Sequence, residues 1–222
     1  MSGCCPTLTG EFDADYVARE LASREKGAAG PTSARLVDLL VSASADGAGL
    51  AGASLLDVGA GFGDIHTALF ERGLGTATHV EASEVYSRAA RDLAREGGWE
   101  DRVRFEIGDF IDLSGALADA DIVTLDRVVC CYPDMPALLD RSAARARRLY
   151  ALSAPRDGWF VRFVIGVKNG VRRIRKDPFR TFVHSWTAMD SRLRALGLEP
   201  VGESGTLIWR VVVYRRANPR SV

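Results

Sequence analysis

The sequence predicts an α/β fold, a Rossmann-like sheet of seven strands that is mostly parallel, ends in an antiparallel hairpin and carries helices on both faces. Between residues 54 and 153, short β-rich runs alternate with helical patterns, as in βαβ units around a buried parallel sheet. The first run ends in glycines and continues directly into an amphipathic helix. The last two runs are joined by only Gly202–Gly205, a spacing typical of a hairpin.

Hydrophobic periodicity and helix-boundary residues predict the individual elements. Two helices are expected before the sheet, one over residues 11–26 and one that Thr32 or Ser33 caps. Five strands are expected at 54–57, 76–81, 102–107, 121–126 and 149–153, with helices beginning at Asp64, Ser83 and Met135 between them. A last helix at 187–196 precedes the hairpin strands, 198–201 and 206–214.

The chain is expected to form one main domain. Residues 1–50 are interpreted as an N-terminal tail and capping helices, and residues 51–222 as the main domain with a helical insertion near 156–180. A small, glycine-containing linker with an Asp46-Gly47 turn signal is expected over residues 42–53. With 222 residues and 47% hydrophobic content, the chain can build a full core.

Composition argues against several classes of protein. The formal net charge is zero, which argues against a dedicated nucleic-acid binder. No apolar run approaches the length of a membrane span and no secretory signal is visible, so a cytoplasmic location is expected. The cysteines form two adjacent pairs, Cys4-Cys5 and Cys130-Cys131, without C-x-x-C spacing, so no metal site is expected.

The segment 57–64, Asp-Val-Gly-Ala-Gly-Phe-Gly-Asp, carries the strongest functional signal. Glycines between a strand and a helix permit a tight turn and a close approach of the backbone to a ligand. The G-x-G-x-G spacing differs from the G-x-G-x-x-G of dinucleotide sites. Asp57 and Asp64 also disfavour a pyrophosphate, because two like charges about 4 Å apart cost roughly 4 kcal/mol at an effective dielectric of 20. Asp64 is either a helix cap or a ligand contact.

This motif resembles the first motif of the class I S-adenosylmethionine-dependent methyltransferases, and the likeness extends over roughly Leu55 to Tyr214. It implies S-adenosyl-L-methionine as the cofactor. Parallel strands meet their ligands at their carboxyl ends, and Glu81 ends the second strand, where an acid can accept both ribose hydroxyls. The cofactor-binding residues expected on this basis are Asp57, Gly59, Ala60, Gly61, Gly63, Glu81, Ala82, Asp109, Phe110 and Asp126.

The resemblance assigns different contacts to these residues. It implies that Ala82 lies beside the adenine, that Asp109 accepts from the adenine amino group with Phe110 lining the base, and that Asp126 lies near the methionine end. The alternatives are a surface charge for Glu81, a turn aspartate for Asp109 and a surface ion pair for Asp126 with Arg127.

Catalytic residues are less constrained than cofactor contacts. Methyl transfer needs positioning and exclusion of water, and a base only when the acceptor must lose a proton. The segment Val128–Asp134 lies where the family contacts its acceptor, but it lacks the N-P-P-Y form of amino-group methyltransferases that act on nucleic acid and protein. Tyr132 and His184 are weak catalytic candidates, against a packed loop tyrosine and a structural histidine.

Residues 156–180 depart from a minimal core. Phe160, Phe163, Val164, Val167, Val171 and Ile174 recur at helical spacing, and eight basic against two acidic residues give a local charge of +6. Three interpretations are open: a core-packing helix with a solvated basic face, a lid over an apolar or anionic substrate, or a membrane-surface helix. The segment's placement resembles the substrate-capping insertion of small-molecule methyltransferases, with a loose likeness to magnesium-protoporphyrin O-methyltransferases.

We therefore expect a methyltransferase that acts on a small-molecule acceptor. The alternatives are a tetrapyrrole or carboxylate O-methyltransferase, or a non-catalytic S-adenosylmethionine-binding partner subunit. A nicotinamide-dependent oxidoreductase is disfavoured by the glycine spacing and the hairpin. No nucleic-acid partner is expected, and a membrane surface is the less favoured partner. The acceptor and the oligomeric state are left open.

Overall fold

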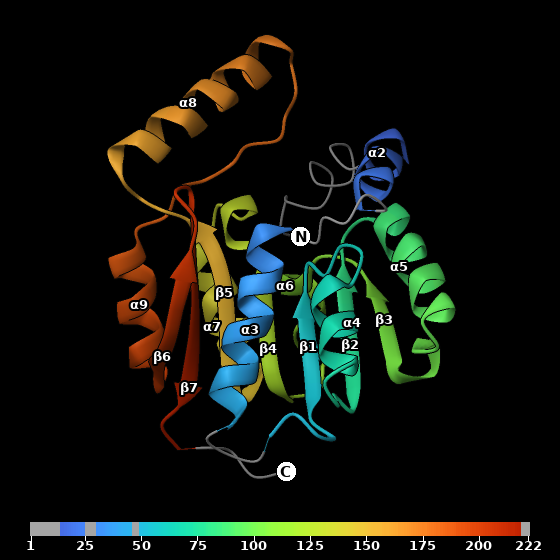
Figure 1. Ribbon diagram of the computed structural model, residues 1–222. Coiled ribbons are helices and arrows are strands. Elements are labelled where there is room, and N and C mark those ends of the chain that lie inside the picture. The colour runs from blue at the N-terminus through green and yellow to red at the C-terminus, as the bar shows by residue number, and fades with distance from the viewer. Residues whose placement is uncertain (1–13, 25–29, 46–48, 219–222) are drawn as a thin grey trace.

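The fold is a seven-stranded sheet between two layers of helices, as the computed structural model shows for residues 14–24, 30–45 and 49–218 (Figure 1). The strand order is β3-β2-β1-β4-β5-β7-β6. The strands are β1 Ser54–Val58, β2 Thr76–Glu81, β3 Val103–Ile107, β4 Ala120–Asp126, β5 Ala146–Pro155, β6 Leu198–Gly205 and β7 Trp209–Arg216. The first five pair in parallel, and β7 runs antiparallel between β5 and β6. The predicted fold class is confirmed.

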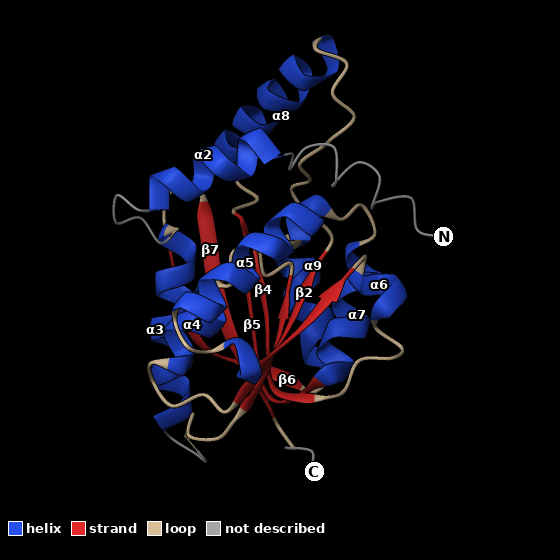
Figure 2. Ribbon diagram, turned by 90° about the vertical axis from the view of Figure 1, so that its right-hand side faces the viewer, coloured by secondary structure: helices blue, strands red, loops and turns tan. Residues whose placement is uncertain are grey.

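The helices divide between the two faces of the sheet, as the turned view shows (Figure 2). They are α2 Ala14–Arg24, α3 Pro31–Ala45, α4 Asp64–Phe70, α5 Glu84–Glu96, α6 Phe110–Leu113, α7 Met135–Arg145, α8 Trp159–Ile174 and α9 Trp186–Ala195, with 3-10 turns η1 Glu100–Arg102 and η2 Val129–Cys131. Helices α3, α4 and α5 lie on one face, and α6, α7 and α9 on the other. Helix α8 lies apart from both layers, beyond the carboxyl ends of the strands.

Two large apolar clusters form most of the core, one on each face of the sheet, and a small third cluster contains Val17, Phe62 and Tyr86. Leu36, Leu55, Leu69 and Ile122 belong to the α3–α4 side, where the predicted inward face of α4 is buried. Leu125, Leu138 and Met189 belong to the α7–α9 side. Most of these side chains are removed completely from water, and that burial is the dominant favourable term in folding.

The predicted cap and length of α3 are wrong. The helix begins at Pro31, where a proline's missing N–H costs nothing. Thr32 and Ser33 lie inside the first turn, and their hydroxyls donate to Asp126 at 3.2 and 2.6 Å. The helix also continues to Ala45, through the first part of the predicted linker. The predicted Asp46-Gly47 turn and the tail of residues 1–10 lie outside the described residues.

The predicted turn of the hairpin is wrong by about four residues. Gly202–Gly205 belong to β6, and the chain reverses over residues 206–208 instead. A register shift between Pro200 and Gly202 marks a bulge, which lets the strand accommodate an extra residue and continue. Thr206 closes the turn: its N–H donates to the carbonyl of Trp209 at 2.8 Å, and its hydroxyl accepts from the N–H of Trp209 at 3.0 Å.

Candidate functional site

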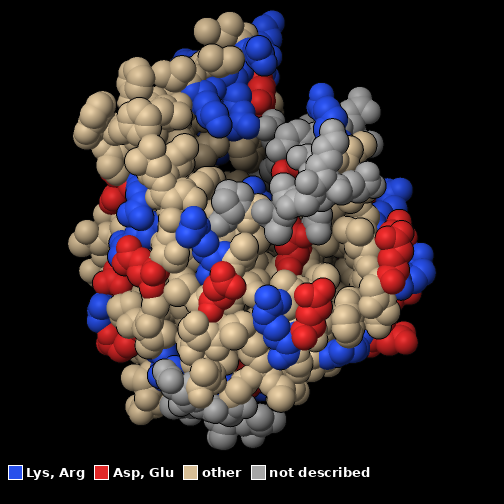
Figure 3. Space-filling view, viewed as in Figure 1, with Lys and Arg blue, Asp and Glu red and all other residues tan. Residues whose placement is uncertain are grey.

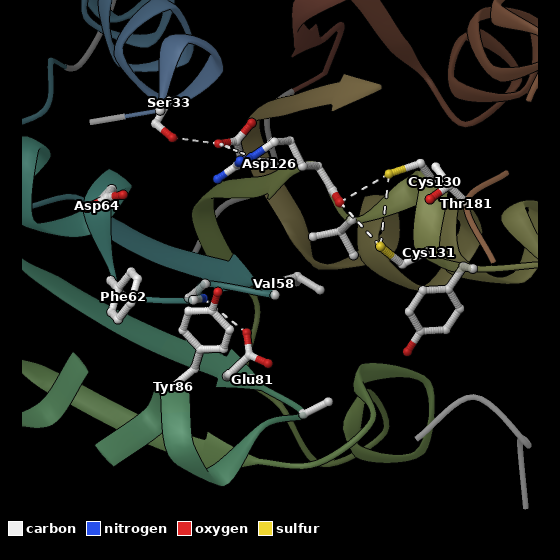
Figure 4. A pocket seen from close by; sticks show the side chains of 18 of the residues that line it. Ser33, Val58, Phe62, Asp64, Glu81, Tyr86, Asp126, Cys130, Cys131 and Thr181 are labelled. Atoms are coloured by element: carbon white, nitrogen blue, oxygen red, sulfur yellow. Dashed lines mark hydrogen bonds and ion pairs between the residues drawn. The ribbon is translucent and has the colours of Figure 1, made fainter. Parts of the chain in front are cut away.

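A cavity of about 480 Å³ opens at the carboxyl ends of β1, β2 and β4, within the size range of small-molecule sites. Figure 4 shows its interior: Glu81 and Tyr86 lie near Phe62 of the glycine turn, whereas Cys130, Cys131 and Thr181 lie at the opposite end. Of the predicted cofactor residues, the cavity is lined by Asp57, Gly59, Ala60, Gly61, Glu81, Ala82, Phe110 and Asp126. Gly63 and Asp109 are not among its lining residues.

The three glycines of the turn have different physical roles. All have positive φ, 62° for Gly59, 54° for Gly61 and 81° for Gly63. A Cβ at Gly59 would lie 2.5 Å from Val128, and one at Gly63 would lie 2.3 Å from the ring of His66. A Cβ at Gly61 would meet only Tyr86, at 4.0 Å. Packing therefore requires glycine at two of these positions, and Gly61 leaves its side-chain space to the cavity.

Asp57 lines the cavity, but its carboxylate makes hydrogen bonds that connect neighbouring elements of the fold. The side chain is almost completely buried. Its Oδ1 accepts from the Thr124 hydroxyl at 2.7 Å, and its Oδ2 lies 3.1 Å from Nδ1 of His66. These contacts join β1, β4 and α4. His66 is buried and has a structural role in this network, and Asp57 reaches the cavity as part of the same network.

Glu81 is held by backbone donors at the floor of the cavity. Its Oε2 accepts from the N–H of Gly61 at 3.0 Å, and its Oε1 accepts from the N–H of Ser83 at 2.8 Å. Burial raises the pKa of Glu81, against the backbone hydrogen bonds from Ser83, Gly61 and Ala82 that lower it. With these three backbone donors in place, the carboxylate keeps capacity for a further hydrogen bond, so the fixed side chain can still accept one from a ligand. The surface-charge alternative does not fit a buried carboxylate.

Asp109 and Asp126 make structural contacts, of which the sequence suggested only a turn role for Asp109 and the ion pair of Asp126 with Arg127, here 3.8 Å long. Asp109 caps α6, where its Oδ1 accepts from the N–H of Ile111 at 2.9 Å and from the hydroxyl of Tyr132. Asp126 accepts from the hydroxyls of Ser33, on α3, and Ser153, on β5. The carboxylate thus ties the first turn of α3 to the sheet beside the cavity. Its pairing across distant elements explains why the sequence pattern could not show it.

Several lining residues were not predicted. Ser33 and Glu20 come from α3 and α2, and Glu20 accepts from the hydroxyl of Tyr86. Arg127 follows β4 with a φ of 60°, a left-handed conformation that non-glycine residues rarely adopt. Its N–H donates to the Ser153 hydroxyl at 2.8 Å. The sequence gives one indication of this part of the cavity, which is the polar pair Asp126-Arg127 at the end of a strand.

The second end of the cavity combines apolar and sulfur-containing side chains. Cys130 and Cys131 carry free thiols whose sulfur atoms lie 3.9 Å apart. Tyr132 lines the cavity, with its hydroxyl donating to Asp109. His184 does not line it: its Nε2 lies 2.8 Å from the carbonyl oxygen of Tyr132, and its ring stacks on Phe182. Geometry therefore favours the structural interpretation of His184.

Helix α8 covers this end of the cavity. Its lining residues are Val164, Ile165, Lys168 and Arg172, spaced as one face of a helix. Phe179 and Thr181, from the return segment, lie on the same side. The interpretation as a core-packing helix is wrong. Only Val164 of the predicted apolar stripe lines the cavity, and the other five residues of the stripe are exposed. Figure 3 shows the surface hollowed beneath α8.

Two further properties concern metals and membranes. Among the described residues, no three or more His, Cys, Asp and Glu side chains are grouped so as to hold a metal ion. None of the helices in the described part of the chain is long and apolar enough to cross a membrane.

Comparison with known proteins gives this fold and cavity a family context. Residues 56–148 match the methyltransferase domain family. No curated protein matches the chain in sequence. Residues 56–148 thus match a methyltransferase domain, and the chain has the class I, Rossmann-like fold that the solved structures share.

Three solved structures illustrate the fold similarity. Magnesium protoporphyrin IX methyltransferase from Synechocystis, solved with bound S-adenosylhomocysteine, is 20% identical with a TM-score of 0.72, and the match covers 95% of this chain and 98% of that one. An O-methyltransferase family 2 protein from Planctomyces limnophilus, in complex with apigenin, is 18% identical (TM-score 0.69; 93% and 62% covered). Geranyl diphosphate C-methyltransferase from Streptomyces coelicolor is 15% identical (TM-score 0.61; 82% and 78% covered).

Proposed function

We propose a small-molecule acceptor for this chain, which by its methyltransferase domain is an S-adenosylmethionine-dependent methyltransferase of the class I fold. The observation that carries the proposal is the two-ended cavity of about 480 Å³ roofed by α8. A volume of this size fits small molecules and does not admit a folded macromolecule. The solved neighbours named above include methyltransferases of small molecules, which supports the same class.

The glycine-turn end of the cavity fits the cofactor. Gly61 leaves open the space that a Cβ would fill, and Glu81 presents a fixed carboxylate that can accept a further hydrogen bond from a hydroxyl group. Ala82 and Phe110 supply apolar contacts for a base beside it. We propose that these four residues, with Gly59 and Ala60, bind S-adenosylmethionine.

The protein's part in the reaction is positioning and exclusion of water. S-adenosylmethionine, when bound, supplies an electrophilic methyl group on a sulfonium. The chain then needs to hold an acceptor atom in line with that group and keep water away. The apolar residues Val164, Ile165 and Phe179 form an apolar part of the cavity wall. In this account no side chain is required as a general base for an acceptor that reaches the site already deprotonated.

A carboxylate acceptor is favoured by the charges beneath α8. Lys168 and Arg172 line the cavity together with apolar neighbours. Arg172 lies over the ring of Phe179, with its guanidinium carbon 4.5 Å from the ring centroid, and its Nε is 3.3 Å from Asp177. An acceptor with an apolar body and an acidic group would satisfy both kinds of wall. The magnesium protoporphyrin IX methyltransferase among the solved neighbours supports this second, narrower candidate.

Transfer of a labelled methyl group to paired acceptors tests the proposal. We expect product from porphyrin or aromatic carboxylic acids and little from the corresponding amides. Lys168→Gln should raise KM for the acid about tenfold, the scale of one charge-assisted hydrogen bond, and leave the affinity for S-adenosylhomocysteine unchanged. Arg173→Gln, also on α8 but outside the cavity lining, is the control and should behave as wild type.

The other outcomes separate the alternatives. Equal transfer to acids and amides, or an unchanged KM in Lys168→Gln, would reject the carboxylate acceptor and keep the small-molecule class. Binding of S-adenosylhomocysteine without transfer to any small molecule of a broad panel would favour the non-catalytic partner subunit.

A further inference from the structure

Helix α8 exposes a continuous apolar stripe on the side that faces away from the cavity. The exposed fraction is 80% for Trp159, 65% for Phe163 and 83% for Ile174. The stripe consists of Trp159, Phe160, Phe163, Val167, Val171 and Ile174, which we call the outer stripe of α8. Single exposed apolar residues are ordinary on protein surfaces, but a contiguous row along a whole helix marks an interaction surface.

The outer stripe lies outside both the buried core and the lining of the cavity. Helix α8 contacts the rest of the protein through its opposite face, on which Val161 and Ile165 are the buried residues. Neither of the strongly exposed ends, Trp159 and Ile174, lines the cavity. The exposure of this apolar stripe is therefore not explained by the core or by the cavity.

The hairpin turn adds to the same apolar surface. Leu207 is 78% exposed at the tip between β6 and β7. The N–H of Arg156, three residues before α8, donates to the carbonyl of Ile208 at 2.7 Å, so the tip lies beside the start of the helix. The apolar surface thus comes from two elements at one end of the molecule (Figure 1).

The charges on α8 itself have a single sign, whereas Asp157 and Asp177 flank the helix in sequence. Helix α8 contains no acidic residue, and Arg162 and Arg173 are exposed one position before Phe163 and Ile174. Arg175 and Lys176 follow the helix and are also exposed. In Figure 3, the left-hand, N-terminal part of α8 is largely uncharged, and Lys and Arg gather toward its C-terminal end at the upper right.

We infer that the outer stripe of α8 docks on an anionic lipid surface. Trp and Phe on one face with Arg and Lys beside them are the features of a helix that lies in the membrane interface, where apolar side chains enter the acyl boundary and cations meet the headgroups. A second copy of the chain is the weaker occupant, because two α8 helices packed together would bring like charges into proximity. The inference concerns the side of α8 opposite the cavity and does not depend on the proposed acceptor.

Vesicle flotation with the full chain tests this inference. Wild type should float with vesicles of phosphatidylcholine and phosphatidylglycerol at low salt, and float much less with phosphatidylcholine alone. High salt should reduce binding, because it screens the cations from the headgroups. The double variant Phe163→Ser/Ile174→Ser should bind the anionic vesicles at least about tenfold more weakly. Val201→Ser changes an exposed apolar residue on β6 and is the matched control, with binding as in wild type.

Two measurements on the same variants exclude trivial explanations. The double variant should keep the wild-type Tm and the wild-type affinity for S-adenosylhomocysteine, because both residues lie outside the core and the cavity. Failure of the wild type to float with anionic vesicles would overturn the inference, as would equal binding by the double variant. Sedimentation that shows a wild-type dimer, lost in the double variant, would overturn it in favour of a second copy.

Discussion

Glu81 is the residue on which the cofactor site depends most. Its carboxylate is fixed by the N–H groups of Gly61 and Ser83, so it is preorganised before a ligand binds. Replacement of Glu81 by alanine should weaken the binding of S-adenosylhomocysteine by about 1.5–3 kcal/mol, the scale of hydrogen bonds to a charged group. Calorimetric titration measures this loss.

The matched control for Glu81 is its exposed neighbour Glu84, which pairs with Arg88 at the start of α5. Glu84→Ala should bind S-adenosylhomocysteine as wild type does. If Glu81→Ala loses less than about 0.5 kcal/mol of binding free energy, its carboxylate does not contact the ligand.

His79 is a buried base that resists protonation in the folded state. It is completely buried on β2, and neither ring nitrogen has a hydrogen-bond partner among the described residues. Burial, together with the nearby His66 and Arg91, lowers the pKa of His79 from 6.5 to about 3. The unfolded chain therefore binds a proton more readily between these values, and stability falls as the pH drops through that window.

The pH dependence can be measured with His79→Leu. Between pH 7.5 and 5, wild type should lose about 2 kcal/mol of unfolding free energy through this group. The variant lacks the titrating ring and should lose correspondingly less in urea unfolding over the same interval. Equal losses in the two proteins would mean that His79 does not titrate in this way.

The sequence identified residues whose role follows from chain order, and missed those whose role follows from packing. Gly61 lies in the turn that follows β1 and Glu81 ends β2, the neighbouring parallel strand, so their meeting at one edge of the sheet could be predicted. Gly63 and Asp109 match the same motifs, but one makes room for the His66 ring and the other caps α6. Ser33 reaches the cavity through a contact with a residue 93 positions away, which no local pattern encodes.

Among the elements, α8 has two faces with different surroundings, one toward the cavity and one toward solvent. Its sequence suggested a single apolar stripe with a basic opposite face. In the structure the opposite face, with Lys168 and Arg172, covers the cavity, and the stripe faces outward. Periodicity predicted the helix correctly, but it does not specify which face meets the protein.

The C-terminal antiparallel hairpin was predicted correctly, but its turn was placed about four residues too early in the chain. Glycines at 202 and 205 resemble a turn, yet both lie in β6, where the bulge after Pro200 accommodates them. The actual turn brings Ile208 and Trp209 to the cavity wall, so the end of this element contributes to the site. Tertiary pairing with β7 outweighed the local turn preference.

At the scale of the whole molecule, one edge of the sheet carries one cavity. The order β3-β2-β1-β4 brings the glycine turn, Glu81 and Asp126 together, and the β5-β7-β6 half with α8 adds the opposite wall. Alternation of strands and helices made this topology predictable. The dimensions of the cavity and the position of Lys168 and Arg172 beneath α8 could be determined only from the folded structure.

The most direct test of this account is titration of S-adenosylhomocysteine and of NAD into the full chain and two variants. Wild type should bind S-adenosylhomocysteine and not NAD. Gly61→Val places a side chain in the cavity, whereas Gly52→Val introduces a similar backbone strain, at a φ of 73°, where a Cβ meets no neighbour within 4 Å. We predict that Gly52→Val retains wild-type binding and that Gly61→Val, still folded, loses it. Binding of NAD by wild type, or S-adenosylhomocysteine affinity in folded Gly61→Val within threefold of wild type, would contradict the central claim.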